Sequence, residues 1–139
     1  MKYEFAPDLQ YEAETIIRSL FPHIKIGFVK CLRSYGSSSN NTIARCHALG
    51  KLMQKAMGVK AFYAIEFLSE HFDSLPQEEK TKVIIHELMH IPKSFGGGFK
   101  HHDFVTTKNV NILYKQYKLE KEKTERSDEI NKDKTRSWF

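Results

Sequence analysis

Apolar residues recur along the chain with two periods, which divide it into helical and extended segments. Over residues 8–21 they follow the helical spacing of three and four residues, and the resulting stripe consists of Leu9, Ala13, Ile16, Ile17 and Leu20. Pro22 ends this predicted helix. A second helical pattern runs from Ser74 to about Ile91, where Pro92 prevents its continuation.

The predicted helix that begins near Ser74 has residues typical of a helix N-terminus and a broad apolar surface. Ser74 and Gln77 have the spacing of a capping box, in which each residue satisfies a backbone N–H of the other. Glu78 and Glu79 suit the positive end of a helix. Apolar side chains cover much of its circumference, so we expect it to be buried in the middle of the domain. These side chains are Val83, Ile84, Ile85, Leu88 and Met89.

Three segments alternate with a period of two or are rich in aromatic and β-branched residues, as strands are. They are Ile24–Leu32, Ile43–Leu49 and Ala61–Leu68. A polar loop over residues 35–41 joins the first two, and we expect those two strands to pair antiparallel.

Two further helices complete the pattern. Lys51–Met57 is a short helical segment that Gly58 ends. After three consecutive glycines, Thr106 or Thr107 can cap a last helix. Its apolar stripe consists of Val110, Leu113, Tyr114 and Tyr117.

The length and composition indicate one globular domain. The chain has 139 residues, of which 40% are hydrophobic and 28% charged. From Lys118 onward nearly every residue is charged or polar, so we expect a single domain over residues 1–123 and a charged, flexible tail over 124–139. The elements predict an α+β fold, with a small mixed or antiparallel three-stranded sheet packed on helices around the helix of residues 74–91.

The net charge and the cysteine content limit which binding partners and which cellular compartment we expect for this protein. The formal net charge of +5 permits an acidic partner such as nucleic acid, but we favour ordinary solubility charge as its explanation. Cys31 and Cys46 are too few for a disulfide scaffold, and neither a signal peptide nor a membrane-length apolar run is visible. We therefore predict a soluble cytoplasmic protein without a membrane partner.

The helix of residues 74–91 contains the pattern His-Glu-x-x-His. His86 and His90 lie four residues apart, hence on one helical face, and can offer both imidazoles to one ion. Glu87 can then reach a water on that ion. This is the zincin arrangement, in which two histidines bind zinc and the glutamate is the general base. An amphipathic helix could also carry two histidines by accident, so a third ligand is needed.

Such a third ligand is available shortly after the motif. A catalytic zinc takes three protein ligands and keeps one position open. The glycines 96–98 can turn the chain back, and His101 and His102 follow His90 by eleven and twelve residues. Adjacent side chains point in different directions, so we expect one of the two to bind, with Asp103 available to support it. The other histidines, for which we expect ordinary surface or pocket roles, are His23, His47 and His71.

The motif predicts a zinc-dependent metallopeptidase with one Zn²⁺ ion and a protein or peptide substrate. Glu87 would take the proton of the zinc-bound water and pass it to the leaving amine. Tyr63, His101 and Arg45 are candidate donors to the oxyanion. Two alternatives are a non-catalytic zinc-binding module and a DNA-associated protease that acts on nucleic-acid-bound proteins. The pattern leaves the particular substrate and the oligomeric state open.

The segment from Arg33 to Tyr117 resembles a family of small predicted metallopeptidases of archaea and phages. The matching residues are Arg33, Gly36-Ser37, Ala44-Arg45 leading into Leu49, Glu66, Phe72-Asp73 and the run from Ile84 to Gly98 with a histidine soon after. The resemblance implies a minimal zincin in which His86, His90 and a later histidine bind zinc and Glu87 is the base.

The resemblance also bears on the third ligand. In the phage relatives the third histidine tends to precede aspartate, which favours His102 before Asp103. The chain is more distantly similar to SprT-like zincins, which cleave proteins crosslinked to DNA. In these an aromatic residue lies three positions after the ligand, which favours His101 before Phe104. We expect His102 to be the ligand, with His101 as the alternative.

Overall fold

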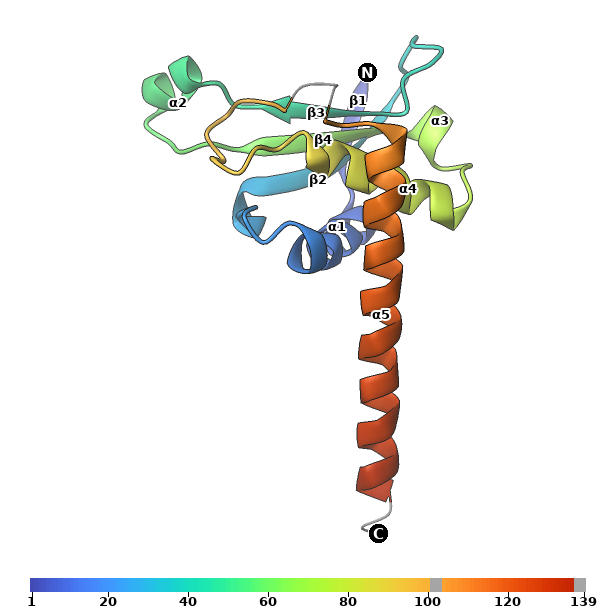
Figure 1. Ribbon diagram of the computed structural model, residues 1–139. Coiled ribbons are helices and arrows are strands. Elements are labelled where there is room, and N and C mark those ends of the chain that lie inside the picture. The colour runs from blue at the N-terminus through green and yellow to red at the C-terminus, as the bar shows by residue number, and fades with distance from the viewer. Residues whose placement is uncertain (101–103, 137–139) are drawn as a thin grey trace.

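The fold is that of a computed structural model, which describes residues 1–100 and 104–136. It is an α+β fold in which one mixed sheet has helices α1, α4 and α5 packed on one side (Figure 1). The strands are β1 (Lys2–Phe5), β2 (Val29–Tyr35), β3 (Ala44–Ala48) and β4 (Tyr63–Leu68). Their order is β1-β2-β4-β3, with β2 and β4 parallel and the outer pairs antiparallel.

The sheet differs from the expected one in number and pairing. The described residues form four strands, not three, because Lys2–Phe5 adds an edge strand whose side chains are all exposed and show no apolar face. The predicted antiparallel pairing of the first two long strands is wrong, since β4 lies between β2 and β3. Tyr63, Ile65 and Phe67 of β4 are completely buried, which explains why this apolar strand takes an inner position.

Five α-helices lie within the described residues: α1 (Pro7–Leu20), α2 (Lys51–Met57), α3 (Ser69–Phe72), α4 (Gln77–Met89) and α5 (Thr107–Arg136). Two predicted ends are confirmed. Gly58 ends α2 in the left-handed conformation, with φ of 67°. The Thr106 hydroxyl accepts a hydrogen bond from the N–H of Asn109 at 3.2 Å and so caps α5.

The predicted start of α4 is wrong. The helix begins at Gln77 after Pro76, and no side chain caps it, so Ser74 is not its N-cap. Proline disfavours the helical conformation of the residue before it, which keeps Leu75 outside the helix. Ile84, Ile85 and Leu88 are completely buried, as expected for a helix in the middle of the domain.

An ion-pair network fixes the helices against β2. The Arg33 guanidinium on β2 donates to both carboxylate oxygens of Asp8 on α1, at 2.7 and 2.8 Å. It also donates to Asp73, which follows α3, at 3.1 Å. Hydrogen bonding to Arg33 holds the pKa of Asp8 below its usual value. Arg33 therefore connects three elements at one end of the sheet.

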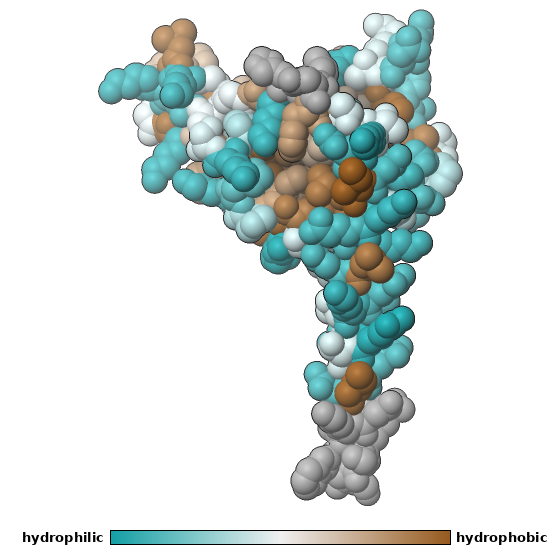
Figure 2. Space-filling view, viewed as in Figure 1, coloured by the Kyte–Doolittle hydropathy of each residue, from teal (hydrophilic) through white to brown (hydrophobic). Residues whose placement is uncertain are grey.

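The expected tail over residues 124–139 is helical through Arg136, where α5 ends. Side chains 121–132 are all exposed, and this part of α5 extends away from the body (Figure 1). It is mostly hydrophilic in Figure 2, with isolated apolar residues. Residues 137–139 lie outside the described part, and the division at residue 123 stays a prediction. No helix in the described ranges is long and apolar enough to cross a bilayer.

Candidate active site

The C-terminal end of α4 brings the two histidines of the motif together. His86 lies in the last turn of the helix, and His90 follows its last residue with helical backbone angles, φ −69° and ψ −17°. The centroids of their rings are 5.2 Å apart, and the ring planes meet at 70°. The two imidazoles thus lie side by side, as their spacing of four residues predicts.

Glu87 is the buried acid of this site. Its side chain is 7% exposed, and burial raises the pKa of its carboxyl to about 7. A carboxyl with a pKa near neutrality can both accept and return a proton at neutral pH. The environment of Glu87 therefore suits a general base.

The backbone of Lys100 orients His90. The Lys100 N–H donates to the His90 carbonyl at 2.8 Å, and the Lys100 carbonyl lies 3.3 Å from Nδ1 of the His90 ring. A carbonyl can only accept, so Nδ1 carries the proton and Nε2 carries the lone pair that a metal requires. This contact could not be predicted from the sequence, because a backbone carbonyl is present at every residue.

The glycine turn between His90 and Lys100 is held from two sides. The Tyr63 hydroxyl accepts from the Gly97 N–H at 2.9 Å and donates to the Gly98 carbonyl at 2.8 Å. The Gln54 side-chain amide donates to the Gly96 carbonyl at 3.1 Å. Because both hydrogen-bonding functions of the Tyr63 hydroxyl are used here, Tyr63 has no free donor for an oxyanion. The Arg45 guanidinium lies 4.0 Å from the carboxylate of Glu66 on the neighbouring strand β4.

Two cavities meet at the motif beside the edge strand β3. One has a volume of about 450 Å³ and the other about 520 Å³. Ala44, His86 and Glu87 line both of them. The smaller is also lined by Arg45, Cys46, His90, Phe99 and Lys100. The larger extends between the start of β3, α4 and α5. The motif is therefore open to a ligand from two directions.

The predicted third ligand cannot be placed. His101, His102 and Asp103 all lie outside the described residues. Within residues 1–100 and 104–136, no three His, Cys, Asp or Glu side chains gather in a way that could hold a metal ion. Lys100, which directly precedes the histidine pair in the sequence, donates its backbone N–H to the His90 carbonyl.

The other histidines contact oxygen atoms of residues outside the motif. Nε2 of His23 lies 3.1 Å from the Ile91 carbonyl, and Nε2 of His71 lies 2.7 Å from the Ser39 carbonyl. Nε2 of His47 lies 2.8 Å from the Glu66 carboxylate. These contacts fit the ordinary roles that we expected for the three side chains.

Both cysteines are free thiols. Their positions in the sheet flank Ile65, since Cys31 on β2 and Cys46 on β3 both lie opposite it. Burial raises the pKa of each thiol to about 12, which keeps it protonated at neutral pH. Cys46 lines the smaller cavity, and the sequence alone did not place it there.

An α+β protein with two adjacent imidazoles and a buried glutamate at a cleft has features typical of metallopeptidases. The chain belongs to the family described as "Putative phage metallopeptidase", whose sequence profile matches residues 1–129. This confirms the resemblance to phage-type metallopeptidases and extends it from Arg33–Tyr117 to β1, α1 and most of α5. No curated protein and no solved structure matches the chain.

Proposed function

We propose that this protein is a zinc-dependent metallopeptidase that hydrolyses peptide bonds. The arrangement at the end of α4 carries the proposal: two imidazoles with ring centroids 5.2 Å apart, next to a buried glutamate. Membership in a family of this description supports a metallopeptidase. The choice of zinc as the metal and the roles of single residues rest on the chemistry of these side chains.

The donor set suits zinc. His86 and His90 would hold the ion together with His102, or with His101 in its place, and imidazole nitrogens are common zinc ligands. The hydrogen bond from Nδ1 of His90 to the Lys100 carbonyl is the kind of outer contact that orients a metal-binding histidine. When bound, zinc activates water and polarises the carbonyl of the substrate.

Glu87 performs the proton transfers in this proposal. Its carboxylate accepts a proton from the attacking water and returns it to the leaving amine. Burial favours this cycle, because it brings the pKa of the carboxyl to about 7. The substrate is a protein or peptide in an extended conformation, and β3, as an edge strand beside the cleft, offers backbone groups with which it can pair.

Substitution of Glu87 and His86 tests the proposal. In Glu87→Gln the ligands remain, so we expect full zinc content by elemental analysis and casein hydrolysis reduced at least a hundredfold. In His86→Ala we expect both zinc and hydrolysis to be lost. His71→Gln is the matched control, since His71 bonds the Ser39 carbonyl and should not affect zinc. Full activity of Glu87→Gln would refute the role of Glu87, and zinc without hydrolysis in the wild type would favour the non-catalytic module.

A paired substitution tests the third ligand. We expect His102→Ala to lose zinc and His101→Ala to retain it, because adjacent side chains point apart and only one can reach the ion. Zinc content and thermal unfolding with and without added zinc are the two measurements. The reverse result would make His101 the ligand. Retention of zinc by both variants would show that the third ligand lies elsewhere.

A further inference from the structure

Helix α2 exposes its apolar side chains to solvent. Leu52, Met53 and Met57 are 82%, 49% and 57% exposed, and no residue of this seven-residue helix is buried. Met53 and Met57 lie four residues apart and Leu52 precedes Met53, so the three side chains share one side of the helix. We refer to these three side chains as the α2 patch.

The side of α2 that faces the body is polar. The Gln54 side-chain amide donates to the Leu49 carbonyl at 2.7 Å and to the Gly96 carbonyl at 3.1 Å. Gln54 is also the one residue of α2 that is partly buried. A surface helix ordinarily turns its apolar side to the core, so α2 has the reverse orientation. Packing within the fold therefore does not explain the α2 patch, and apolar side chains gathered outside a core mark an interaction surface.

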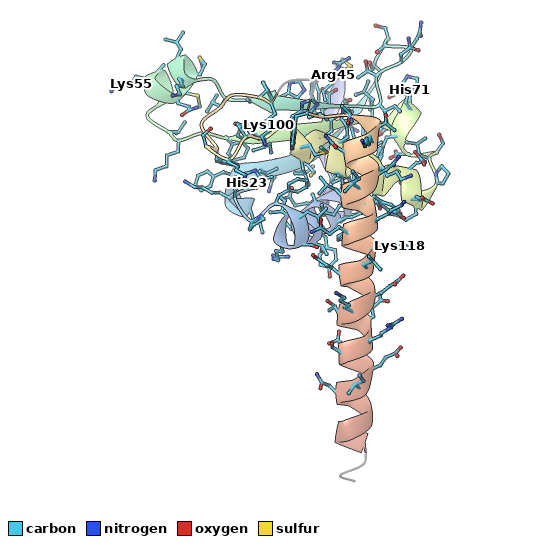
Figure 3. The ribbon with its side chains drawn as sticks, viewed as in Figure 1. His23, Arg45, Lys55, His71, Lys100 and Lys118 are labelled. Atoms are coloured by element: carbon cyan, nitrogen blue, oxygen red, sulfur yellow. The ribbon has the colours of Figure 1, made fainter. Side chains whose placement is uncertain are left out.

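The surroundings of the α2 patch are positively charged. Lys51, Lys55 and Lys60 are exposed, and residues 46–65 contain no acid. Among the described residues, none of the three lysines forms an ion pair. Figure 3 shows Lys55 on α2, at the edge of the body and away from α5. A partner that matches this surface combines apolar side chains with negative charge.

Helix α2 lies at one end of the edge strand β3. From Ala48, the last residue of β3, a short connection leads to Lys51 at the start of the helix. The first residue of β3, Ala44, lines both cavities at the motif. The strand spans about 13 Å between these two residues. A peptide that pairs with β3 as we propose therefore extends from the motif towards α2.

We propose that α2 binds a segment of the protein substrate that combines apolar and acidic side chains and lies outside the residues at the motif. A role of this contact in turnover rests on the proposed function, whereas binding of the segment does not. The α2 patch contacts the apolar side chains, and its two methionines can adapt to different shapes. Lys51 and Lys55 attract the acidic ones. Because both contacts are made by one substrate chain, each strengthens the other.

Peptide binding to the Glu87→Gln variant tests this inference without hydrolysis. Labelled peptides share one neutral sequence for the cleft and carry the segment Glu-Leu-Glu-Phe-Glu at either end. One comparison form replaces Glu with Gln, and another replaces Leu and Phe with Ser. We expect the full segment, at one of the two ends, to bind about tenfold more tightly than both comparison forms in fluorescence anisotropy. Equal binding of the three forms at both ends overturns the inference.

Substitutions on α2 locate the contact. The tenfold advantage should be lost in the double variant Leu52→Gln, Met57→Gln. It should be reduced in Lys55→Gln, where the dependence of binding on salt should also fall. All three side chains are exposed, so the variants should fold, and circular dichroism verifies this.

Matched controls on α5 separate a defined surface from general charge and apolarity. Lys118→Gln removes an exposed lysine of α5, which Figure 3 shows away from α2. The double variant Leu119→Gln, Ile130→Gln removes two apolar side chains that are 59% and 54% exposed. Both controls should keep the tenfold advantage. Loss of the advantage in the controls as well as in the α2 variants overturns the inference.

Other occupants of the α2 patch give a different result. Vesicles of phosphatidylserine and phosphatidylcholine and a labelled single-stranded DNA are tested with the same variants. We expect neither to depend on Leu52 and Met57. Tight binding of either through these two residues, with no preference among the peptides, would assign α2 to that partner and overturn the proposal.

Kinetics of the active enzyme provide the second measurement. We expect the segment joined to the cleavable sequence to lower KM about tenfold with kcat unchanged. The same segment added as a separate peptide should not lower KM, because the effect depends on linkage. Hydrolysis without an advantage of the joined segment contradicts the inference alone. Binding of the segment through α2 by a protein without zinc or hydrolysis contradicts the proposed function alone.

Discussion

At the scale of single residues, the unusual groups of this protein are ionisable side chains held out of water. Glu87 is buried among apolar residues of α4, and burial alone raises its pKa to about 7. Glu66 is equally buried but ionised, because Ser34, His47 and Arg45 surround it. Two carboxyls with similar exposure thus have opposite pKa shifts, and the neighbouring hydrogen-bond donors and charges decide the direction.

The raised pKa of Glu87 predicts that ionisation of its carboxyl lowers the free energy of unfolding of the metal-free protein. In the unfolded chain a glutamate ionises with a pKa of about 4.3, so the folded state loses stability as the pH rises from there towards 7. Above pH 7 the cost reaches about 4 kcal/mol as an upper bound. In EDTA, urea unfolding should therefore show Glu87→Gln to be more stable than the wild type at pH 8 and nearly equal to it at pH 4.

A control for this measurement is Glu122→Gln, which changes an exposed carboxylate on α5. It should alter stability by less than about 0.5 kcal/mol at either pH. If the metal-free Glu87→Gln variant is no more stable than the wild type at pH 8, the carboxyl of Glu87 is better solvated than the structure indicates.

At the scale of elements, the glycine turn determines how the chain passes from His90 to Lys100. Gly97 adopts a φ of 102°, a region that side chains other than glycine rarely enter. A Cβ atom there would lie 2.7 Å from the Leu49 carbonyl oxygen and 2.6 Å from the Gln54 amide. The turn therefore packs directly against the start of α2.

Gly97→Ala should destabilise the protein by about 2–4 kcal/mol in urea unfolding, since strain and close contact act together. It should also weaken zinc binding, because the turn supports Lys100 and hence the ring of His90. Gly98→Ala is the neighbouring control. No atom lies within 4 Å of its added Cβ, so we expect a change below about 1 kcal/mol. Similar effects of the two substitutions would contradict the packing described here.

At the scale of the whole molecule, a compact body carries a long projecting helix (Figure 1). The Ser19 hydroxyl of α1 donates to the Glu120 carboxylate of α5 near the point where α5 leaves the body. Beyond it every side chain through Lys132 is exposed. Opposite charges four residues apart, such as Glu122 with Arg126 and Asp128 with Lys132, support a helix that has no apolar face.

Removal of residues 125–139 should therefore shorten a helix without weakening the body. We expect the truncated chain to retain its Tm within about 2 °C and to lose helical ellipticity at 222 nm. In 1 M NaCl the full chain should lose more ellipticity than the truncated one, because salt screens the charge pairs. A large fall in Tm on truncation would show that the projecting helix contacts the body. Equal salt effects would show that charge pairs do not sustain it.

Features that depend on residues only a few positions apart in the chain could be predicted from the sequence. The apolar stripe of α1, the Gly58 end of α2 and the Thr106 cap of α5 all follow from residues a few positions apart. The pairing of His86 with His90 follows in the same way, since one helical turn separates them. The helical conformation of residues 124–136 was not expected, because their charge pairs lack the apolar period on which the prediction rests.

The motif, most of the helices and the strand-forming segments therefore follow from the order of amino acids. The position of β4 between β2 and β3 follows instead from the three-dimensional fold, because strand order depends on contacts between residues far apart in the chain. The same holds for the Lys100 carbonyl at His90 and for Cys46 in the wall of the smaller cavity. A backbone carbonyl is common to all residues, and the wall of a cavity has no period along the chain, so neither can be found from the order of amino acids.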